Sequence, residues 1–506
     1  MIIGAGHNAM SYYLFPIIFV DAMKMAQDHW TIVQAAGQNW PPPVGGTMPA
    51  LDANGYPIGL AALPSHGYGL ATSIYVSNAY VHPPGVYTLQ FDGEGTVMIR
   101  IGNGSVQPNQ TFNQADGHSQ VYSVDIPATT SAGFSIVIVA SNPANYVRNI
   151  RLVMPGYQGT YLTQPFESNF LAQLKPLQIM RFSGLPINSS TQMVGFKWAN
   201  MTPVTYRTQC TTNGVAVEYV VALANALGQH IWASYPVDAD HDFLYNYTKY
   251  VLDNLAGNLS LYVEYGNETW NTFYSNEFQF IESYRILLGF PKNWQGWTHA
   301  LAILAKQTWD VCRSVLPAGH QTRIKRVAAS QLVNPAMLAD ELSALVLLSA
   351  APDMGFDVIS VASYFGPTQA QRSGYTSATT TDQVLVDSSA NLAQLDSDLA
   401  AFMVVAKKYP FAKTIMYESG LNMTSDFVNP SPWYAAMIGV QTSPDTYPVM
   451  LDHFHRLQKA GVDGMVYSSF IYPASMWGQT GLIQYSGEPI GSAPKLKALT
   501  DFIAGA

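Results

Sequence analysis

After Pro155, short apolar runs alternate along the chain with longer segments whose apolar residues recur at helical spacing. The apolar runs end in polar or aromatic residues, as buried parallel strands do, and they cover residues 177–182, 230–235, 261–268, 324–331, 358–364, 414–418 and 464–470. Helical patterns lie between them at 215–227, 300–315 and 447–458. This alternation predicts βαβ units that form a parallel sheet.

Two further segments complete the predicted fold. An eighth strand is available at residues 2–6, followed by a helix-like segment at 19–26. Between residues 59 and 153 the pattern changes to short runs of β-branched and aromatic residues bounded by Gly, Pro, Asn or Asp, which is typical of a β-sandwich. We therefore predict an α/β fold, a (β/α)8 TIM barrel with an inserted β-sandwich domain. Its parts are residues 1–45 as the first β/α unit of the barrel, 46–155 as the β-sandwich and 156–506 as the remainder of the barrel.

The composition narrows the choice of partners. Of the 506 residues, 48% are hydrophobic and only 11% are charged, against about 25% in an average soluble domain. The 24 Lys and Arg residues are outnumbered by 33 Asp and Glu residues, so we expect neither nucleic acid nor an anionic membrane as a partner. The longest apolar stretch near the start, 12–20, is interrupted by Pro16 and is too short to span a bilayer. A neutral partner such as a sugar fits this composition.

The same composition bears on localisation. A surface with few carboxylates and few bases loses less stability in acid than an ordinary surface does. Asn-x-Ser/Thr sequons, which favour a secreted glycoprotein, begin at Asn103, Asn109, Asn188, Asn200, Asn246, Asn258, Asn267 and Asn422. We expect an extracellular protein that works in an acidic environment.

Two features of the sequence bear on whether the protein has a metal site or a disulfide. The alternating acidic residues of segment 237–243 lack the Gly and the distal Glu of a calcium loop, so we expect Asp238 or Asp240 to cap the next helix instead. Cys210 and Cys312 lie about a hundred residues apart, which leaves a disulfide between them open. The sequence indicates neither a metal site nor a cofactor.

Two of the predicted strands end in glutamates, one of which follows an asparagine. Asn267 and Glu268 come at the end of the fourth strand, and Glu418 ends the seventh. Active sites of (β/α)8 barrels lie at the carboxyl ends of the strands, and strands four and seven face each other there. Cleavage of a glycosidic bond needs two carboxyl groups, one to protonate the departing oxygen and one to meet the anomeric carbon. The pair Glu268 and Glu418 therefore predicts a glycosidase.

This pattern resembles clan A of the retaining glycoside hydrolases, which have an Asn-Glu pair after the fourth barrel strand and a Glu after the seventh. The resemblance covers the barrel. It implies that Glu268 is the general acid/base, that Glu418 is the nucleophile and that Asn267 binds a sugar 2-hydroxyl. Residues 264–271, together with a loop at 184–190, also look similar to cellulase-like proteins of bacteria and archaea.

Three more residues extend the resemblance. Arg181 ends the second strand and Tyr364 the sixth, matching the Arg and Tyr that flank the clan's nucleophile. Trp477 lies just beyond the eighth strand and matches the Trp under the cleaved sugar. Arg181 and the Tyr364 hydroxyl would keep Glu418 ionised, and that negative charge would raise the pKa of Glu268. Glu268 would then carry a proton when the substrate arrives.

Aromatic and imidazole side chains near the strand ends are candidates for substrate binding. Indole faces stack on the C–H surfaces of sugars without any charge, and Trp198, Trp270 and Trp477 are the best placed to do so. His241 follows the third strand, from which it could reach the cleft.

Glu264 has the same strand parity as Glu268. We therefore expect its side chain to point into the barrel. The expected role is structural, in an ion pair with Arg326 or Lys325 of the fifth strand.

We interpret the sequence as a secreted retaining glycosidase whose partner is a neutral β-linked polysaccharide or oligosaccharide, a β-glucan such as cellulose, cleaved in endo fashion. The charge-poor loops offer no Arg or Lys cluster for uronic acids. One alternative is an exo-acting β-galactosidase or β-xylosidase on the same scaffold, which a blocked cleft would favour. Another is a non-catalytic carbohydrate-binding surface protein, which would not need both carboxylates and Arg181.

Overall fold

The computed structural model describes residues 1–7, 10, 17–34, 47–60, 68–74, 82–101, 109–127, 133–183, 195–271, 275–317, 321–424 and 430–505. The chain divides into two units. The first consists of Met1–Ala9, Gln173–Met201 and Val217–Ala506, and the second of Met10–Ala172 and Thr202–Ala216. The chain therefore passes from the first unit into the second and back twice.

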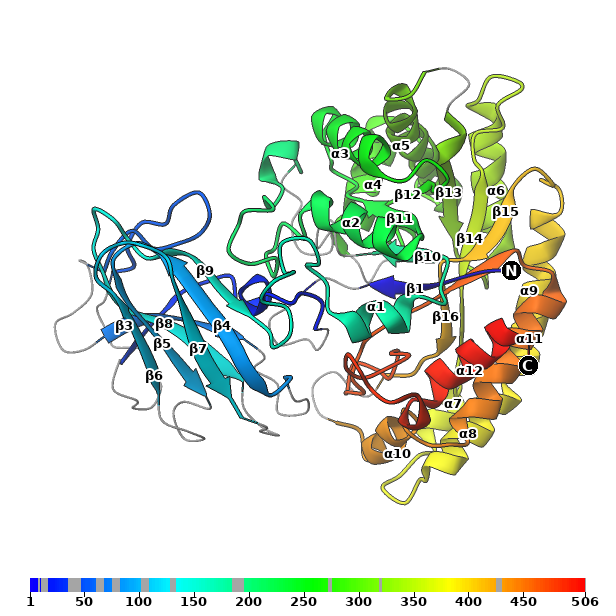
Figure 1. Ribbon diagram of the computed structural model, residues 1–506. Coiled ribbons are helices and arrows are strands. Elements are labelled where there is room, and N and C mark those ends of the chain that lie inside the picture. Colours follow the sequence, from blue (N-terminus) through cyan, green and yellow to red (C-terminus); the bar gives the residue numbers. More distant parts are fainter. Residues whose placement is uncertain are drawn as a thin grey trace. The chain divides into compact units, whose positions relative to one another are not determined.

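Eight parallel strands close into a ring in the first unit (Figure 1). In order around the ring they are β1 (Ile2–His7), β10 (Ile179–Phe182), β11 (His230–Tyr235), β12 (Leu261–Tyr265), β13 (Ile324–Ser330), β14 (Val358–Phe365), β15 (Lys413–Met416) and β17 (Gly464–Tyr467), which pairs with β1. All eight correspond to predicted strands. The first unit is a (β/α)8 barrel, as predicted.

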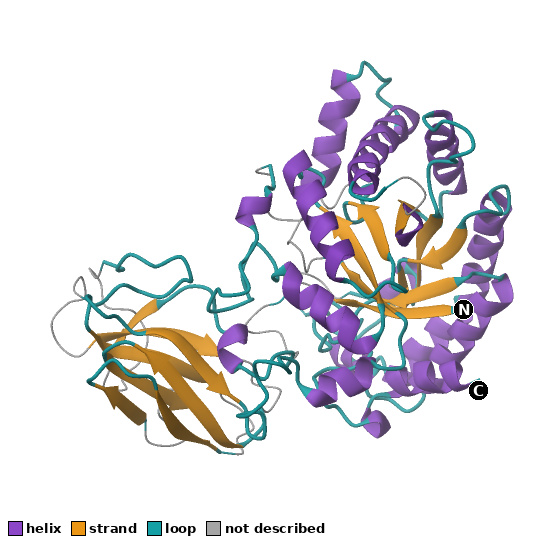
Figure 2. Ribbon diagram, turned by 45° about the horizontal axis from the view of Figure 1, so that its top comes forward, coloured by secondary structure: helices purple, strands orange, loops and turns teal. Residues whose placement is uncertain are grey.

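Helices lie outside this ring of strands (Figure 2). They are α2 (Val217–Leu227), α3 (His241–Asn254), α4 (Ser275–Leu287), α5 (Trp294–Ser314), α6 (Pro335–Leu347), α7 (Gln369–Ser373), α8 (Thr381–Ala390), α9 (Leu392–Ala406), α10 (Tyr434–Gly439), α11 (Thr446–Ala460) and α12 (Pro494–Ala504). The predicted helical segments 215–227, 300–315 and 447–458 correspond to α2, α5 and α11, and α5 starts at Trp294, earlier than its apolar pattern indicates. In the described part of the chain, no helix is both long and apolar enough to span a bilayer.

An extra residue interrupts the seventh barrel strand. Strand β14 pairs Ile359 with Thr414 of β15 but Ala362 with Glu418 of β16 (Glu418–Leu421), so three steps along β14 match four steps along its neighbour. This is a β-bulge, which reverses the alternation of side chains beyond it. Tyr417 belongs to the buried cluster inside the barrel, and the bulge turns the next side chain, Glu418, inward as well.

Two antiparallel sheets make up most of the second unit. One contains β2 (Thr31–Gln34), β3 (Tyr68–Ile74), β8 (Phe134–Ser141), β5 (Gly95–Ile101) and β6 (Gln110–Gln114), and the other β7 (Gln120–Ile126), β4 (Gly85–Asp92) and β9 (Arg148–Val153). Tyr87 of β4 meets Phe134 of β8 edge to face, with ring centroids 6.2 Å apart. The sheets confirm the all-β pattern read between residues 59 and 153, and their stacking as a β-sandwich stays a prediction.

The second unit includes more of the chain than the predicted β-sandwich domain of residues 46–155. Residues 19–26, expected as the first barrel helix, form only the one-turn 3-10 helix η1 (Ala22–Met25), which belongs to the second unit. The reason is local: one carboxylate oxygen of Asp21 accepts from the N–H of Met23 and from that of Leu152 on β9, at 3.1 and 2.9 Å. These bonds hold η1 against the sheet. Thr202–Ala216, expected within the barrel, also belongs to this unit.

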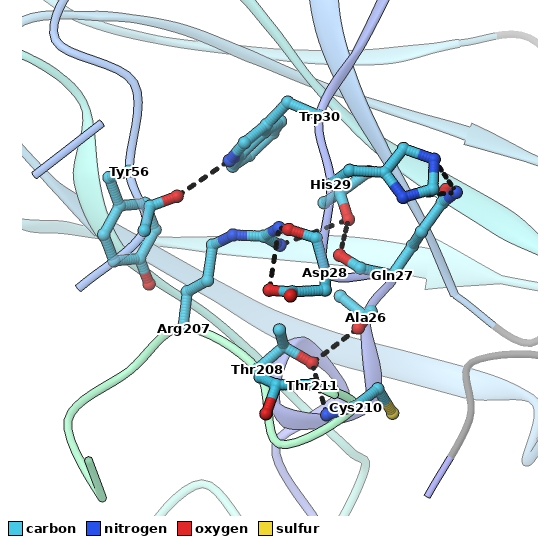
Figure 3. Close-up of polar contacts among 12 residues, drawn as sticks. Ala26, Gln27, Asp28, His29, Trp30, Tyr56, Arg207, Thr208, Cys210 and Thr211 are labelled. Carbon is cyan, nitrogen blue, oxygen red and sulfur yellow. Dashed lines mark hydrogen bonds and ion pairs between the residues drawn. The ribbon is translucent and has the colours of Figure 1, made fainter. Parts of the chain in front are cut away.

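A buried arginine holds that second segment in place (Figure 3). The guanidinium of Arg207 lies over the ring of Trp30, 4.8 Å from its centroid, and pairs with the carboxylate of Asp28 at 4.0 Å. It also donates to the Asp28 carbonyl and, at 3.3 Å, to the Thr72 hydroxyl. The Arg207 side chain is fully buried. Residues distant in sequence are thus joined by one cation.

The two cysteines are both free and buried. Cys210 lies beside Arg207 in the second unit, and Cys312 lies on α5 in the first. The disulfide that the sequence leaves open is not formed. Burial raises the pKa of each thiol to about 12, so both remain protonated at neutral pH and are poor nucleophiles.

Replacing Arg207 removes the cation from between Trp30 and Asp28. We expect Arg207→Ala to lower the free energy of unfolding by about 2 kcal/mol, because a buried stacking contact and several hydrogen bonds are lost together. Chemical denaturation followed by circular dichroism measures the change. Lys175→Ala, at an exposed position, is the control. If Arg207→Ala is as stable as Lys175→Ala, the contacts of Arg207 do not hold Thr202–Ala216 in place.

Candidate active site

Arg181 on β10 connects the polar groups inside the mouth of the barrel. Its side chain is fully buried. Nη1 donates to Oε1 of Glu418 at 2.7 Å, and Nη2 donates to Oδ1 of Asn267 at 2.7 Å. Nε and Nη2 each donate to one oxygen of Glu264 at 3.0 Å. One guanidinium therefore holds three groups from two other barrel strands and the loop after β12.

Glu264 is inside the barrel, as predicted, but its predicted partner is wrong. It pairs with Arg181 and accepts further hydrogen bonds from Trp232 at 2.7 Å and Ser234 at 3.0 Å. Arg326 is bound by Asp353 and Asp357 instead. The alternation along β13 explains the difference, because Val327 belongs to the interior cluster and the preceding side chain points to the opposite face.

Glu418 accepts one hydrogen bond on each carboxylate oxygen. Arg181 donates to Oε1, and the hydroxyl of Tyr364 on β14 donates to Oε2 at 2.6 Å. Burial and the negative charge of Glu418 hold the pKa of Tyr364 well above its usual value, so the phenol keeps the proton it donates. The Glu418 side chain is 13% exposed. Its carboxylate is therefore fixed by two donors and remains accessible to a small reactant.

Glu268 lies in a loop with a left-handed backbone. Gly266 has φ +69° and Glu268 has φ +48°, a conformation that a side chain with a Cβ rarely adopts. The Asn271 amide donates to Oε2 of Glu268 at 2.9 Å, and the Asn271 N–H donates to the Glu268 carbonyl at 2.7 Å. The N–H of Asn267 donates to the buried carboxylate of Glu277 at 3.0 Å. These bonds hold the strained turn that presents Asn267 and Glu268.

The environment of Glu268 makes it a weak acid. Burial raises its pKa to about 7, and the negative charge of Glu418 acts in the same direction. Hydrogen bonds from Asn271 and Tyr417 and the charge of Arg181 oppose this rise in pKa. Glu268 thus carries a proton over most of the acidic range, as a general acid must.

Tyr417 is a site residue that the sequence analysis missed. Its hydroxyl donates to Oε1 of Glu268 at 3.2 Å, and its ring lies against the guanidinium of Arg181, with 4.9 Å between the charge centre and the ring centroid. In a regular strand Tyr417 and Glu418 would face opposite sides. Only the β-bulge places both in the barrel, and no pattern in the sequence marks its position.

The structure joins Arg181, Asn267, Tyr364 and Glu418 by hydrogen bonds and places Glu268 close enough to Glu418 for the negative charge of Glu418 to raise the pKa that burial already raises. The sequence analysis singled out all five of these residues, and their roles in catalysis and substrate binding stay a prediction.

The other predicted binding residues all belong to the barrel unit. Trp270 is half-buried and packs against the interior cluster, Trp477 follows β17 and is 54% exposed, and Trp198 is half-buried in the 3-10 helix η3 (Trp198–Asn200). His241 is the exposed first residue of α3 and stacks on Tyr245. Their contact with substrate stays a prediction.

The acidic run after the third strand has structural roles. Asp240 caps α3 by accepting from the N–H of Phe243 at 2.8 Å, as predicted, and Asp238 accepts from the N–H of Gly195 at 2.8 Å. Within the described ranges, no three His, Cys, Asp or Glu residues gather as metal ligands would.

The chain matches no protein-family model and no curated protein. Among solved structures it is similar to a GH51 arabinofuranosidase from Xanthomonas axonopodis pv. citri, with 13% identity, 62% of each chain covered and a TM-score of 0.41. It is also similar to the CBM22-1–GH10 modules of a xylanase from Clostridium thermocellum, with 8% identity, 97% of each chain covered and a TM-score of 0.36. A GH128 endo-β-1,3-glucanase from Amycolatopsis mediterranei has 13% identity, with 66% of this chain and 95% of that chain covered and a TM-score of 0.32. At such low similarity, the function has to be argued from the geometry of the site.

The raised pKa of Glu268 has a consequence for stability. Its folded value of about 7 lies above the ordinary 4.5, so the folded chain loses stability as the pH rises from 4.5 to 7 and the group must ionise. We expect Glu268→Gln to be more stable than the native chain by about 3 kcal/mol at pH 8 and equally stable below about pH 4. Denaturation at a series of pH values measures the difference, with Glu218→Gln on α2 as the control. A gain that does not depend on pH would contradict the raised pKa.

Proposed function

We propose that this protein is a retaining glycosidase of clan A, with Glu268 as general acid/base and Glu418 as nucleophile. One observation carries the proposal: two neighbouring glutamates in the barrel mouth have opposite environments. Glu418 receives two strong donors, whereas Glu268 is buried beside a negative charge and has its pKa raised to about 7. Retaining glycosidases need this division of roles between two carboxyl groups.

In the proposed mechanism each of these residues has a step. An oxygen of Glu418 forms a bond to the anomeric carbon while the glycosidic bond breaks, and Glu268 gives its proton to the departing oxygen. The ester formed on Glu418 has no charge, so the pKa of Glu268 falls and its carboxylate accepts a proton from the water that then cleaves the ester. Arg181 and Tyr364 hold Glu418 in position, and their hydrogen bonds stabilise its negative charge before the ester forms and after it is cleaved.

Asn267 is oriented for the substrate by Arg181. Its Oδ1 accepts from the guanidinium, so the amide NH2 group is directed away from Arg181. That group is a donor for a sugar hydroxyl. The proposed partner is the 2-hydroxyl, where an added hydrogen bond strengthens in the transition state.

For the substrate we propose a neutral β-linked glucan, cleaved within the chain. The low charge of the protein and the tryptophans around the site support a neutral sugar. For localisation we propose secretion into an acidic environment. The low surface charge and the sequons support it, and a fall in stability below pH 4 as steep as that of an ordinary protein would count against it.

Substitution of the two glutamates tests the proposed chemistry. We expect Glu418→Gln and Glu268→Gln each to lower hydrolysis of β-glucan by about a thousandfold, because each removes a group that acts in the transition state. A panel of β-glucans, xylans and mannans, assayed for reducing ends, measures the loss and identifies the substrate, with Glu218→Gln as the control.

Native rates in either variant would overturn the mechanism. Proton NMR of the first product adds an independent result. A retained anomeric configuration is expected, and an inverted one would exclude Glu418 as the nucleophile.

Tyr417→Phe tests how the pKa of Glu268 is set. The lost hydroxyl stabilises the ionised form, so its removal should raise the pKa of Glu268 and move the basic limb of the kcat/KM profile upward by about half a pH unit. A variant that loses activity without any shift of this limb would show that Tyr417 only packs.

A further inference from the structure

A pocket of about 390 Å³ lies in the barrel unit beside the loop that carries Glu268. Its walls come from Trp270 of that loop, from Phe278 on α4, from Trp294 and Trp297 at the start of α5, and from Met337 on α6. We call it the tryptophan pocket. The mechanism above assigns no role to it.

Four aromatic side chains line this pocket. Phe278 stacks on Trp297 with ring centroids 5.7 Å apart and planes inclined by 19°, which fixes the orientation of that indole. Trp294 is 44% exposed, although a side chain of this size is usually well covered. Flat, rigid rings with one free face bind the C–H surface of a sugar at a small entropic cost.

Two donors in these walls are unsatisfied. The indole N–H groups of Trp270 and Trp297 are buried and have no hydrogen-bond partner among the described residues. Trp297 is only 3% exposed. A buried donor without an acceptor is unfavourable. Both nitrogens have almost no accessible surface, so a sugar hydroxyl reaches these N–H groups only if the indoles move on binding, whereas the exposed indole face of Trp294 is open to the C–H surface of a sugar.

The charges around the pocket favour a neutral occupant. Arg285 makes two hydrogen bonds of 2.7 Å to the Glu282 carboxylate, so these two lining charges neutralise each other. Lys292, the remaining cation of the lining, is exposed to solvent. The lining therefore contains no buried, unpaired cation that would select an anionic group.

We propose that the tryptophan pocket binds one sugar ring of a neutral oligosaccharide, on the leaving-group side of Glu268. This inference rests on the proposed function, because the acid protonates the oxygen of the departing sugar. Trp270 follows Glu268 by two residues, and the Asn271 side chain is hydrogen-bonded to the Glu268 carboxylate at 2.9 Å. The pocket would make the enzyme prefer oligosaccharides to short glycosides.

Binding to the full-length Glu418→Gln chain tests the proposal without turnover. Calorimetric titrations with cellotetraose, xylotetraose and mannotetraose identify the sugar that binds most tightly. That sugar is then titrated into a chain that carries Trp294→Ala as well as Glu418→Gln. We expect the affinity to fall about tenfold or more. Phe411→Ala is the matched control, because Phe411 is 45% exposed and lies at the opposite end of β15, and it should leave the affinity unchanged.

The outcomes separate this proposal from the proposed function. Unchanged affinity in the Trp294→Ala chain, while the native protein hydrolyses the same oligosaccharide, would overturn the tryptophan pocket alone. Weakened binding by Trp294→Ala in a protein that hydrolyses no substrate would support the pocket and reject the glycosidase. A titration with p-nitrophenol, a planar aromatic compound that is not a sugar, serves as a comparison. If p-nitrophenol binds and Trp294→Ala abolishes that binding, while none of the three tetrasaccharides binds, the assignment of a sugar is overturned.

Discussion

The buried guanidinium of Arg181 is the interaction on which the site depends. Its donors lie in one plane and reach Glu264, Asn267 and Glu418, which come from β12, the loop after it and β16. A lysine has a single charged nitrogen and could not fix three acceptors in set directions. The position of Glu418, the orientation of the Asn267 amide and the polar interior of the barrel therefore follow from one side chain.

Burial and the charges around Arg181 together give Glu268 a different environment from that of Glu418. Glu264 is fully buried and takes two of the guanidinium's hydrogen bonds, so it compensates the positive charge. Burial raises the pKa of Glu268 most, and the negative charge of Glu418 raises it further, by more than Arg181 lowers it. In a chain with only 11% charged residues, a buried group of one cation and three carboxyl groups indicates a functional site.

The sequence predicted the barrel and the meeting of Glu268 and Glu418 at one rim because both depend on local patterns. Each strand is a short apolar run, and the polar residues that end such runs meet at one rim. Features that depend on tertiary register were missed. The bulge that turns Tyr417 and Glu418 to the same side has no local signature, and the partner of Glu264 depends on which face of β13 looks inward. Likewise, 19–26 reads as a helix, but a hydrogen bond from the distant Leu152 to Asp21 holds it in the second unit.

The central claim is that Glu418 attacks the anomeric carbon and carries the sugar between the two steps. The most direct measurement is mass spectrometry of the intact protein and its peptides after incubation with 2,4-dinitrophenyl 2-deoxy-2-fluoro-glycosides, whose ester intermediates hydrolyse slowly. The account predicts one added sugar, attached to Glu418. A sugar attached to another residue, or an unmodified protein that remains an active hydrolase in the presence of the reagent, would contradict it.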